Sequence, residues 1–159
     1  MIPYKLIDSA LIERVLLEAQ ASPRRRRNFN FHDSEQHPCQ RLINAVLPDS
    51  YIQPHRHLDP SKEEMLVVLR GRLGLVFFDE AGGVTGRVVI APGGPEVAVN
   101  IPVRSFHTAV AFEPSVVFEA KAGPYVPHSR DEMAGFAPAE GSPDAAGYMA
   151  RLKQLFDHA

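Results

Sequence analysis

The sequence has one cysteine, little net charge and no long hydrophobic run. Its 159 residues carry a formal net charge of −2, and Cys39 is the single cysteine. One cysteine cannot form a disulfide within the chain, and we expect it to be a small buried residue. No stretch approaches the roughly 20 apolar residues that cross a bilayer. A weakly acidic chain also lacks the strong positive charge of nucleic-acid-binding domains, so we expect neither nucleic acid nor a membrane as partner.

The first residues lack the features of an export signal. The segment MIPYKLIDSALIERV has acidic residues within its apolar stretch and no small-residue cleavage site. Together with the single cysteine, this predicts a cytoplasmic protein. There is no internal repeat and no low-complexity tract, and we expect residues 1–159 to form a single domain.

Helical patterns occur only near the two ends of the chain. Asp8 or the serine after it can cap a first helix, whose apolar residues recur at helical spacing before Pro23 ends it. Asp144 can cap a second helix with an apolar stripe. We therefore expect helical regions within residues 1–23 and 144–159.

Between these ends, short apolar segments alternate with turn residues. The expected strands are residues 41–46, 65–69, 73–78, 86–90, 96–101, 105–112 and 115–120. Such spacing is typical of an antiparallel sandwich or barrel. Several segments are apolar on both faces, which predicts a packed interior and an exterior covered by another sheet, a helix or a second subunit. We place the barrel in residues 24–122 and a surface connection rich in Pro, Gly and Ser in residues 123–143.

Two histidines separated by one residue precede an acidic pair and an apolar segment. In an extended chain alternate side chains point the same way, so His55 and His57 would face one side. Glu64 begins the next expected strand and could reach the same point. Imidazoles with one carboxylate suit iron, manganese, nickel, cobalt or zinc better than calcium or magnesium. The alternative is that both histidines are exposed in a loop, and the spacing alone does not decide between the two.

This pattern resembles the first motif of the cupin superfamily. The motif has His-x-His, an acid, and a glycine after six further residues, which are here His55, His57, Glu64 and Gly71. Glu63 is the fallback ligand if the loop is shifted by one residue.

A second segment resembles the second cupin motif, in which a histidine follows a proline by five positions. Here these residues are Pro102 and His107. Two positions depart from the motif: Arg104 replaces its glycine, and Ala111 replaces a later asparagine. The departures concern the turn rather than the ligands.

Five segments across the chain resemble the WbuC family of cupin-fold metalloproteins. They are SPRRRRNFNFH, YIQPHRH, VVLRGRL, SFHTAVAF and EAKAGPYVP. The resemblance implies a mainly β chain that forms a single cupin barrel (a double-stranded β-helix, or jelly roll) with an N-terminal and a C-terminal helix. It also implies a divalent transition metal (Fe, Zn, Mn or Ni) held by a ligand set of His55, His57, Glu64 and His107. Such proteins are often encoded among O-antigen and polysaccharide genes, which implies an anionic or sugar-related small-molecule ligand.

The segment RRRRNFNFH adds further candidates. The alternation of Phe29 and Phe31 predicts a strand with one apolar face. The run Arg24–Arg27 is either a solvated group of charges without partners or an arm in which an arginine meets an anionic ligand. His32 could support the metal site or transfer a proton there, and Tyr125 could line the barrel mouth. The alternatives are that His32 is a surface histidine and that Tyr125 is simply packed.

Three functions remain open. The first is a metal-dependent enzyme, an oxygenase or an isomerase, that acts on a small molecule. The second is a non-catalytic module that uses the metal to hold a small ligand. The third is a metal-free sugar isomerase or epimerase, which needs a base and a proton donor rather than a set of metal ligands. Cupin barrels commonly pair through their sheets, so we also expect a homodimer.

Overall fold

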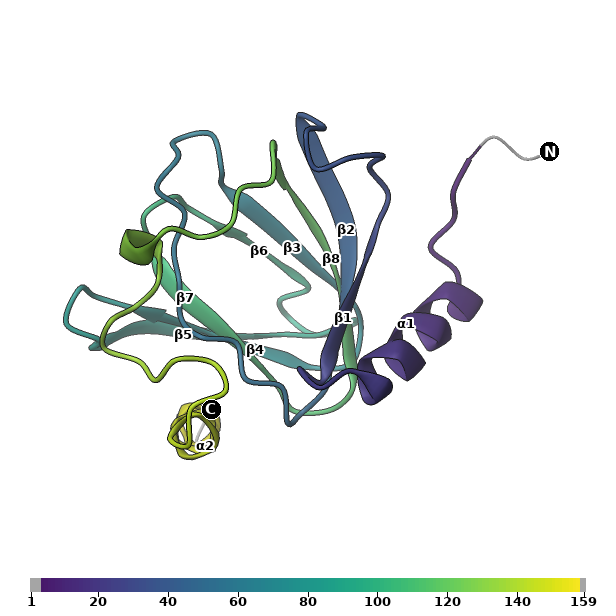
Figure 1. The fold of residues 1–159 in the computed structure, drawn as a ribbon. Helices are drawn as coiled ribbons and strands as arrows, with labels where there is room; N and C mark the ends of the chain where they lie inside the picture. Colours follow the sequence, from purple (N-terminus) through teal and green to yellow (C-terminus); the bar gives the residue numbers. More distant parts are fainter. Residues whose placement is uncertain (1–3, 158–159) are drawn as a thin grey trace.

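The computed structural model describes residues 4–157, and its core is two antiparallel sheets that face each other (Figure 1). The larger sheet has the strand order β1-β2-β8-β3-β6, and the smaller has the order β5-β4-β7. The strands are β1 (Arg26–Asn30), β2 (Cys39–Val46), β3 (Glu64–Arg70), β4 (Leu73–Phe78), β5 (Val84–Ile90), β6 (Ala98–Ile101), β7 (Phe106–Ala111) and β8 (Ser115–Ala122). The jelly-roll arrangement that the sequence predicts is confirmed, and the ends of the expected strands differ by at most two residues.

The inner faces of the two sheets enclose a hydrophobic core. In β4, Leu73 and Leu75 are buried in this core, while Val76 and Phe78 point to the opposite face and are also buried. Because successive side chains point to opposite faces, one strand contributes residues to two separate apolar layers. This explains why the central strands read as apolar on both faces.

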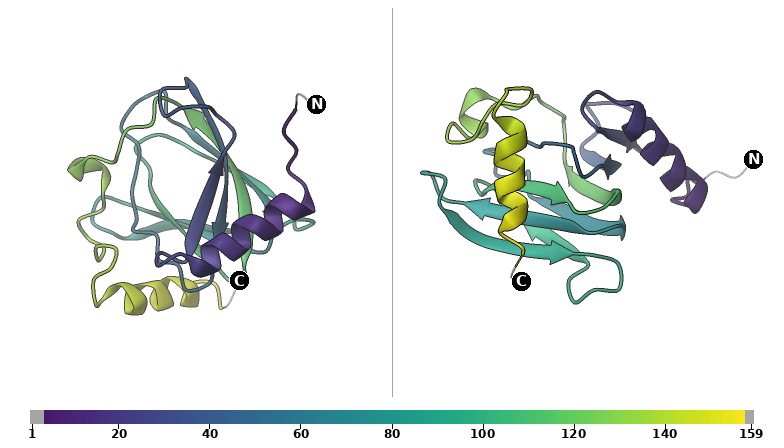
Figure 2. Two further views of the ribbon diagram at one scale, coloured as in Figure 1. Left: turned by 45° about the vertical axis from the view of Figure 1, so that its right-hand side comes forward. Right: turned by 90° about the horizontal axis from the view of Figure 1, so that it is seen from below.

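Helix α1 (Ser9–Ala21) covers the outer face of the larger sheet (Figures 1 and 2). The carboxylate of Asp8 accepts a hydrogen bond from the backbone N–H of Leu11, so the expected cap is present. Val15 and Leu16 are buried against residues of β2 and β8. The helix thus removes the second apolar layer of these strands from water.

Helix α2 (Ala145–Gln154) lies across the outer face of the smaller sheet (Figure 2). Leu152 and the following Phe156 are buried against β4 and β7. Gly74 permits this contact, because a Cβ atom at that position would lie 2.8 Å from the Phe156 ring. Asp144 precedes the helix, but its side chain makes no capping hydrogen bond, so that expected cap is wrong.

Other surface features differ from expectation or stay untested. Cys39 is exposed at the start of β2, because the strand begins at the molecular surface, and the expectation of a buried cysteine is wrong. The apolar side chain of Met65, in β3, is 40% exposed. The homodimer, in which a second subunit would cover such apolar surface, remains a prediction. No helix in the described part of the chain is long and apolar enough to span a bilayer.

Candidate functional site

The histidines are brought together by backbone pairing between the segment before β3 and strand β7. The N–H of His55 donates to the carbonyl of His107 (3.0 Å), and the N–H of His107 donates to the carbonyl of His55 (2.9 Å). Residues paired in this way project their side chains to one side, and the two ring centroids lie 4.7 Å apart. His57 follows two residues later, with its ring 5.7 Å from that of His55. The segment makes isolated bridges rather than a full strand, but the expected common direction of the two rings is present.

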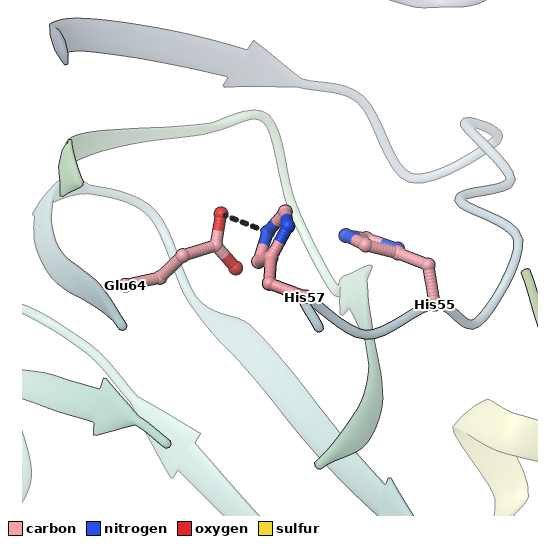
Figure 3. Close-up of side chains that lie close together, drawn as sticks. All are labelled: His55, His57 and Glu64. Atoms are coloured by element: carbon pink, nitrogen blue, oxygen red, sulfur yellow. Dashed lines mark ion pairs between the residues drawn. The ribbon is translucent and has the colours of Figure 1, made fainter. Parts of the chain in front are cut away.

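Glu64, the first residue of β3, extends its carboxylate toward these rings (Figure 3). Its Oε1 lies 3.1 Å from Nε2 of His57, and its Oε2 lies 3.1 Å from Nε2 of His107. One ligand atom from each of His55, His57 and Glu64 lies within 4.8 Å of the others. The ring of His107 is farther from that of His57, at 6.3 Å, so His107 joins the group through Glu64 and His55. Glu63 instead accepts a hydrogen bond from Asn100 at the surface.

Two of the imidazoles are oriented by backbone carbonyls. Nδ1 of His55 lies 3.0 Å from the carbonyl oxygen of Gln53, and Nδ1 of His107 lies 2.9 Å from that of Ser105. A neutral imidazole has one N–H, so a ring that donates through Nδ1 presents a lone pair at Nε2. Metal-binding histidines are commonly held in this way.

The protonation states and spacing also fit a divalent cation. Burial, with a further contribution from His107, lowers the pKa of His55 to about 3, so the ring is neutral at pH 7. Burial alone would raise the pKa of Glu64, but His107, His57 and the charge of Lys121 hold it well below its ordinary value. Nε2 of His57 is buried without a well-aligned hydrogen bond. Ligand atoms about 2.1 Å from one ion lie roughly 3 Å apart at right angles, which agrees with the contacts to Glu64.

A partly buried lysine and a second, buried carboxylate lie beside Glu64. Lys121 in β8 is directly opposite Glu64 in β3, and its Nζ lies 2.9 Å from Oε1 of Glu64 and 2.6 Å from Oε1 of Glu119. Asn44 donates to the other oxygen of Glu119. Burial would lower the pKa of Lys121, but the charges of Glu119 and Glu64 outweigh it and raise the pKa. The lysine is therefore a fixed positive charge between two carboxylates.

Two cavities, each of about 170 Å³, are lined by residues of this group. The inner cavity includes His55, Glu64 and His107 and has an apolar wall from the barrel core. The outer cavity includes His57 and Tyr125, and Lys121 lines both cavities. The sequence predicts that Tyr125 either lines the barrel mouth or is packed; it lines this outer cavity, and its place at the mouth stays a prediction.

His128 lies over the site, although no sequence motif singles it out. Its ring stacks on that of His57, with centroids 5.1 Å apart and an interplanar angle of 28°, and lies 4.6 Å from the ring of His55. His57, His128 and Glu132 form a second group whose ligand atoms lie within 4.8 Å of one another. His128 is in the loop before the 3₁₀ helix η1 (Arg130–Glu132). Only the tertiary path of this loop brings it to the site, so sequence spacing gives no signal.

The remaining candidates lie apart from the four residues expected to bind a metal. His32 is buried, its Nδ1 lies 3.0 Å from the carbonyl oxygen of Arg41, and it lines neither cavity. All four residues of Arg24–Arg27 form ion pairs, with Glu140, Asp49 or Glu18, so the interpretation as charges without partners is wrong. Arg26 also lines the inner cavity.

A family model described as "Domain of unknown function (DUF6016)" matches residues 7–90, more than half of the chain. The chain belongs to this family. The DUF6016 match includes His55, His57 and Glu64 and ends before His107. No curated protein matches the sequence.

Several solved structures are similar to this DUF6016 protein. KdgF from Halomonas sp. has a TM-score of 0.50 and 17% identity, over 66% of this chain and 84% of that chain. TT1209 from Thermus thermophilus has a TM-score of 0.52 and 16% identity, over 75% of this chain and 97% of that chain. The capsular polysaccharide assembling protein CapF from Staphylococcus aureus has a TM-score of 0.52 and 18% identity, over 67% of this chain and 29% of that chain. Identities this low establish only that this chain shares the fold of these structures.

Proposed function

We propose that this protein is a metal-binding cupin that acts on a small molecule, with the metal held by the ligand set His55, His57, Glu64 and His107. The observation that supports the proposal is the convergence of His55, His57 and Glu64, with His107 in contact with the same carboxylate, beside a cavity. Neutral imidazoles and an ionised carboxylate are the donors that divalent Fe, Zn, Mn and Ni accept.

A bound metal would supply Lewis-acid chemistry or lower the pKa of a bound water. The chain's own residues supply the rest. Lys121 keeps Glu64 ionised and oriented through a 2.9 Å contact. The apolar wall of the inner cavity limits the access of water to the reacting groups.

The cavities favour an enzyme over a module that only holds a ligand. Besides the ligand set they contain titratable groups, namely Lys121, Glu119 and His128. A reaction needs such groups close to the substrate, whereas passive binding does not. The metal-free isomerase is less well supported, because the low pKa of Glu64 makes that carboxylate a weak base.

The class of substrate is proposed from the resemblance to WbuC proteins. That resemblance favours a sugar-related or anionic molecule, in bacterial polysaccharide or O-antigen metabolism.

Metal content measured by elemental analysis tests the proposal. The protein is purified without a metal-chelating column and compared with the His55→Ala/His57→Ala double variant. We expect near-stoichiometric metal in the parent and its loss in the folded double variant. An absence of metal from the parent, even after reconstitution with Fe, Mn, Ni and Zn, would refute the proposal.

Two single variants identify which histidines bind. His37→Ala removes a partly buried histidine outside the site and is expected to retain full metal content. His128→Ala is also expected to retain the metal. Loss of metal in His128→Ala, with retention in His55→Ala, would move the site to the group of His57, His128 and Glu132.

A further inference from the structure

Lys62 is a buried lysine in the loop between His57 and Glu64. Its residue surface is 9% exposed, and its Nζ donates to the carbonyl oxygen of Pro124 at 2.9 Å. An ammonium group has three N–H donors, so this single contact with a neutral acceptor leaves two donors available. Among the residues that the structure describes, no carboxylate forms an ion pair with Lys62.

The acidic residues near Lys62 have other partners. Asp59 accepts hydrogen bonds from the backbone N–H and the hydroxyl of Ser61. Glu132 accepts hydrogen bonds from the backbone N–H groups of Leu58 and Ser129. The hydrogen bonds from Ser61, and to a smaller extent the charge of Lys62, lower the pKa of Asp59, but neither carboxylate forms an ion pair with Lys62.

The second lysine of the outer cavity differs from Lys62 in this respect. Lys121 contacts both Glu64 and Glu119, so its charge is compensated within the protein. Lys62 is the lysine of this cavity whose charge is available to a ligand. Burying an ammonium group without a counterion is costly, and an anionic ligand would offset that cost.

We infer that the outer cavity is an anion subsite, in which Lys62 binds the carboxylate or phosphate group of the small molecule that reaches the metal site. The inference rests on the proposed function for the link to the metal. The subsite itself stands on the burial and contacts of Lys62. The cavity also contains His57, so an anion held there lies beside the ligand set. Tyr125, which is 48% exposed in the same cavity, adds a hydroxyl donor.

Calorimetric titration at low ionic strength tests the subsite with inorganic phosphate and, separately, with succinate. The full chain is titrated after metal removal by a chelator and again after reloading with zinc. We expect the parent to bind at least one of the two anions, and the stronger binder identifies the group that the subsite takes. Lys62→Gln should weaken that binding by roughly tenfold or more, because a charge-assisted hydrogen bond is lost, while Lys62→Arg should retain most of it.

Lys153 provides a matched control. It is also a partly buried lysine whose ammonium donates to a proline carbonyl, that of Pro48, but it lies in α2 and lines neither cavity. Lys153→Gln should bind phosphate and succinate as the parent does. An equal loss in both variants, unchanged binding in Lys62→Gln, or no binding of either anion by the parent would overturn the inference.

Acetylation of lysines in the parent protein tests the subsite without depending on the folding of any variant. Acetylation of Lys62 by acetic anhydride, followed by mass spectrometry, should slow severalfold in the presence of the anion that binds, while acetylation of Lys153 should not change. Equal rates at Lys62 with and without the anion would count against the subsite.

Metal content distinguishes the two proposals. A parent protein that binds an anion through Lys62 but binds no metal supports the subsite alone. A parent that binds metal but neither anion supports the metal site alone.

Discussion

Nε2 of His107 lies 3.1 Å from Oε2 of Glu64, and the two residues come from different sheets. His107 is in β7 of the smaller sheet, and Glu64 begins β3 of the larger one. A cation bound between them would therefore connect the two halves of the barrel at its mouth. A ligand that binds only the folded protein stabilises it by an amount that grows with the logarithm of the ratio of its concentration to its dissociation constant.

Removal of metal by a chelator should lower the melting temperature. Metal at about 1,000 times its dissociation constant adds roughly 4 kcal/mol to the free energy of unfolding, which for a chain of this size corresponds to about 10 °C. Differential scanning calorimetry with and without chelator measures the change. His107→Ala should show a reduced response to the chelator, and His37→Ala should respond as the parent does. If the chelator does not change the melting temperature of the parent protein, no bound cation connects the two sheets.

Replacing Lys121 by methionine should destabilise the fold strongly. The change leaves the buried carboxylates of Glu64 and Glu119 without the cation that lies between them. Loss of one partner from a buried ion pair costs about 3–5 kcal/mol. Urea unfolding of the chelated protein measures the cost. The double variant Glu119→Gln/Lys121→Met should recover part of the loss, since it replaces one of the two buried acids that have lost their cation with a neutral amide.

Lys153→Met serves as the comparison for this experiment. Lys153 is partly buried, but its ammonium contacts a carbonyl rather than a carboxylate. We expect this variant to lose no more than about 1 kcal/mol. If Lys121→Met is no less stable than Lys153→Met, the contacts of Lys121 with Glu64 and Glu119 do not contribute to the free energy of unfolding.

The strands could be predicted from the sequence because each depends on local patterns. Alternation of apolar residues defines segments such as β4, and the turn residues that follow define their ends. The direction of His55 and His57 also follows from local geometry. Their convergence with Glu64 and His107 was predicted only through the resemblance to cupins, because loop lengths alone permit several arrangements.

The parts that could not be predicted depend on contacts between distant segments. His128 reaches the site through a loop whose sequence spacing to the proposed ligands follows no motif. Arg24 pairs with Glu140, which is 116 positions away in the sequence. Whether Lys121 faces the cavity depends on the pairing of β8 with β3, which alternation in β8 does not specify. Such features follow from tertiary structure rather than from local preference.

Gly71, the glycine of the first motif, is required for two reasons. Its φ is +82°, and a Cβ atom there would lie 2.4 Å from the hydroxyl of Ser115 and 2.6 Å from the carbonyl oxygen of Pro114. Gly71→Ala should therefore cost about 3 kcal/mol or more, from backbone strain and a steric clash together. Gly93 has a similar φ of +74° with open space around it, so Gly93→Ala should cost only about 1 kcal/mol. Chemical denaturation of both variants separates the two effects, and equal losses would contradict the clash.

Arg104 occupies the position where the second cupin motif has glycine, and its φ is +65°. Its backbone N–H donates to the carbonyl of His57, at 2.7 Å, so the turn helps to hold a proposed ligand. The left-handed conformation costs a non-glycine residue about 1–2 kcal/mol, and glycine loses about 0.5–1 kcal/mol of that gain through backbone entropy. Arg104→Gly should thus stabilise the protein by up to about 1 kcal/mol in thermal unfolding and leave its metal content unchanged. Val103→Gly, in the same turn without a positive φ, should destabilise it, and similar losses in both variants would argue against strain at Arg104.

Glu140 should make part of the stability depend on acidic pH. Burial would raise the pKa of this carboxyl, but hydrogen bonds from Arg24 and Arg26 lower it to about 2. The ordinary value is about 4.3, so the folded state holds the proton less tightly than the unfolded state. The contribution is therefore complete above about pH 5 and is lost as the pH falls toward 2. Because the group is partly exposed, we expect it to be no more than about 1 kcal/mol.

Denaturation of the parent and of Glu140→Gln from pH 2 to pH 7 measures this contribution. The variant should be less stable at pH 7, and the difference should shrink as the pH falls below 5, since protonation removes the same charge that the substitution removes. Asp49→Asn removes the more exposed pair with Arg25 and should change stability less. A difference between Glu140→Gln and the parent that stays constant down to pH 2 would show that the amide disturbs packing. The ion pairs that connect the arginine run to the C-terminal part of the chain would then carry no pH-dependent stability.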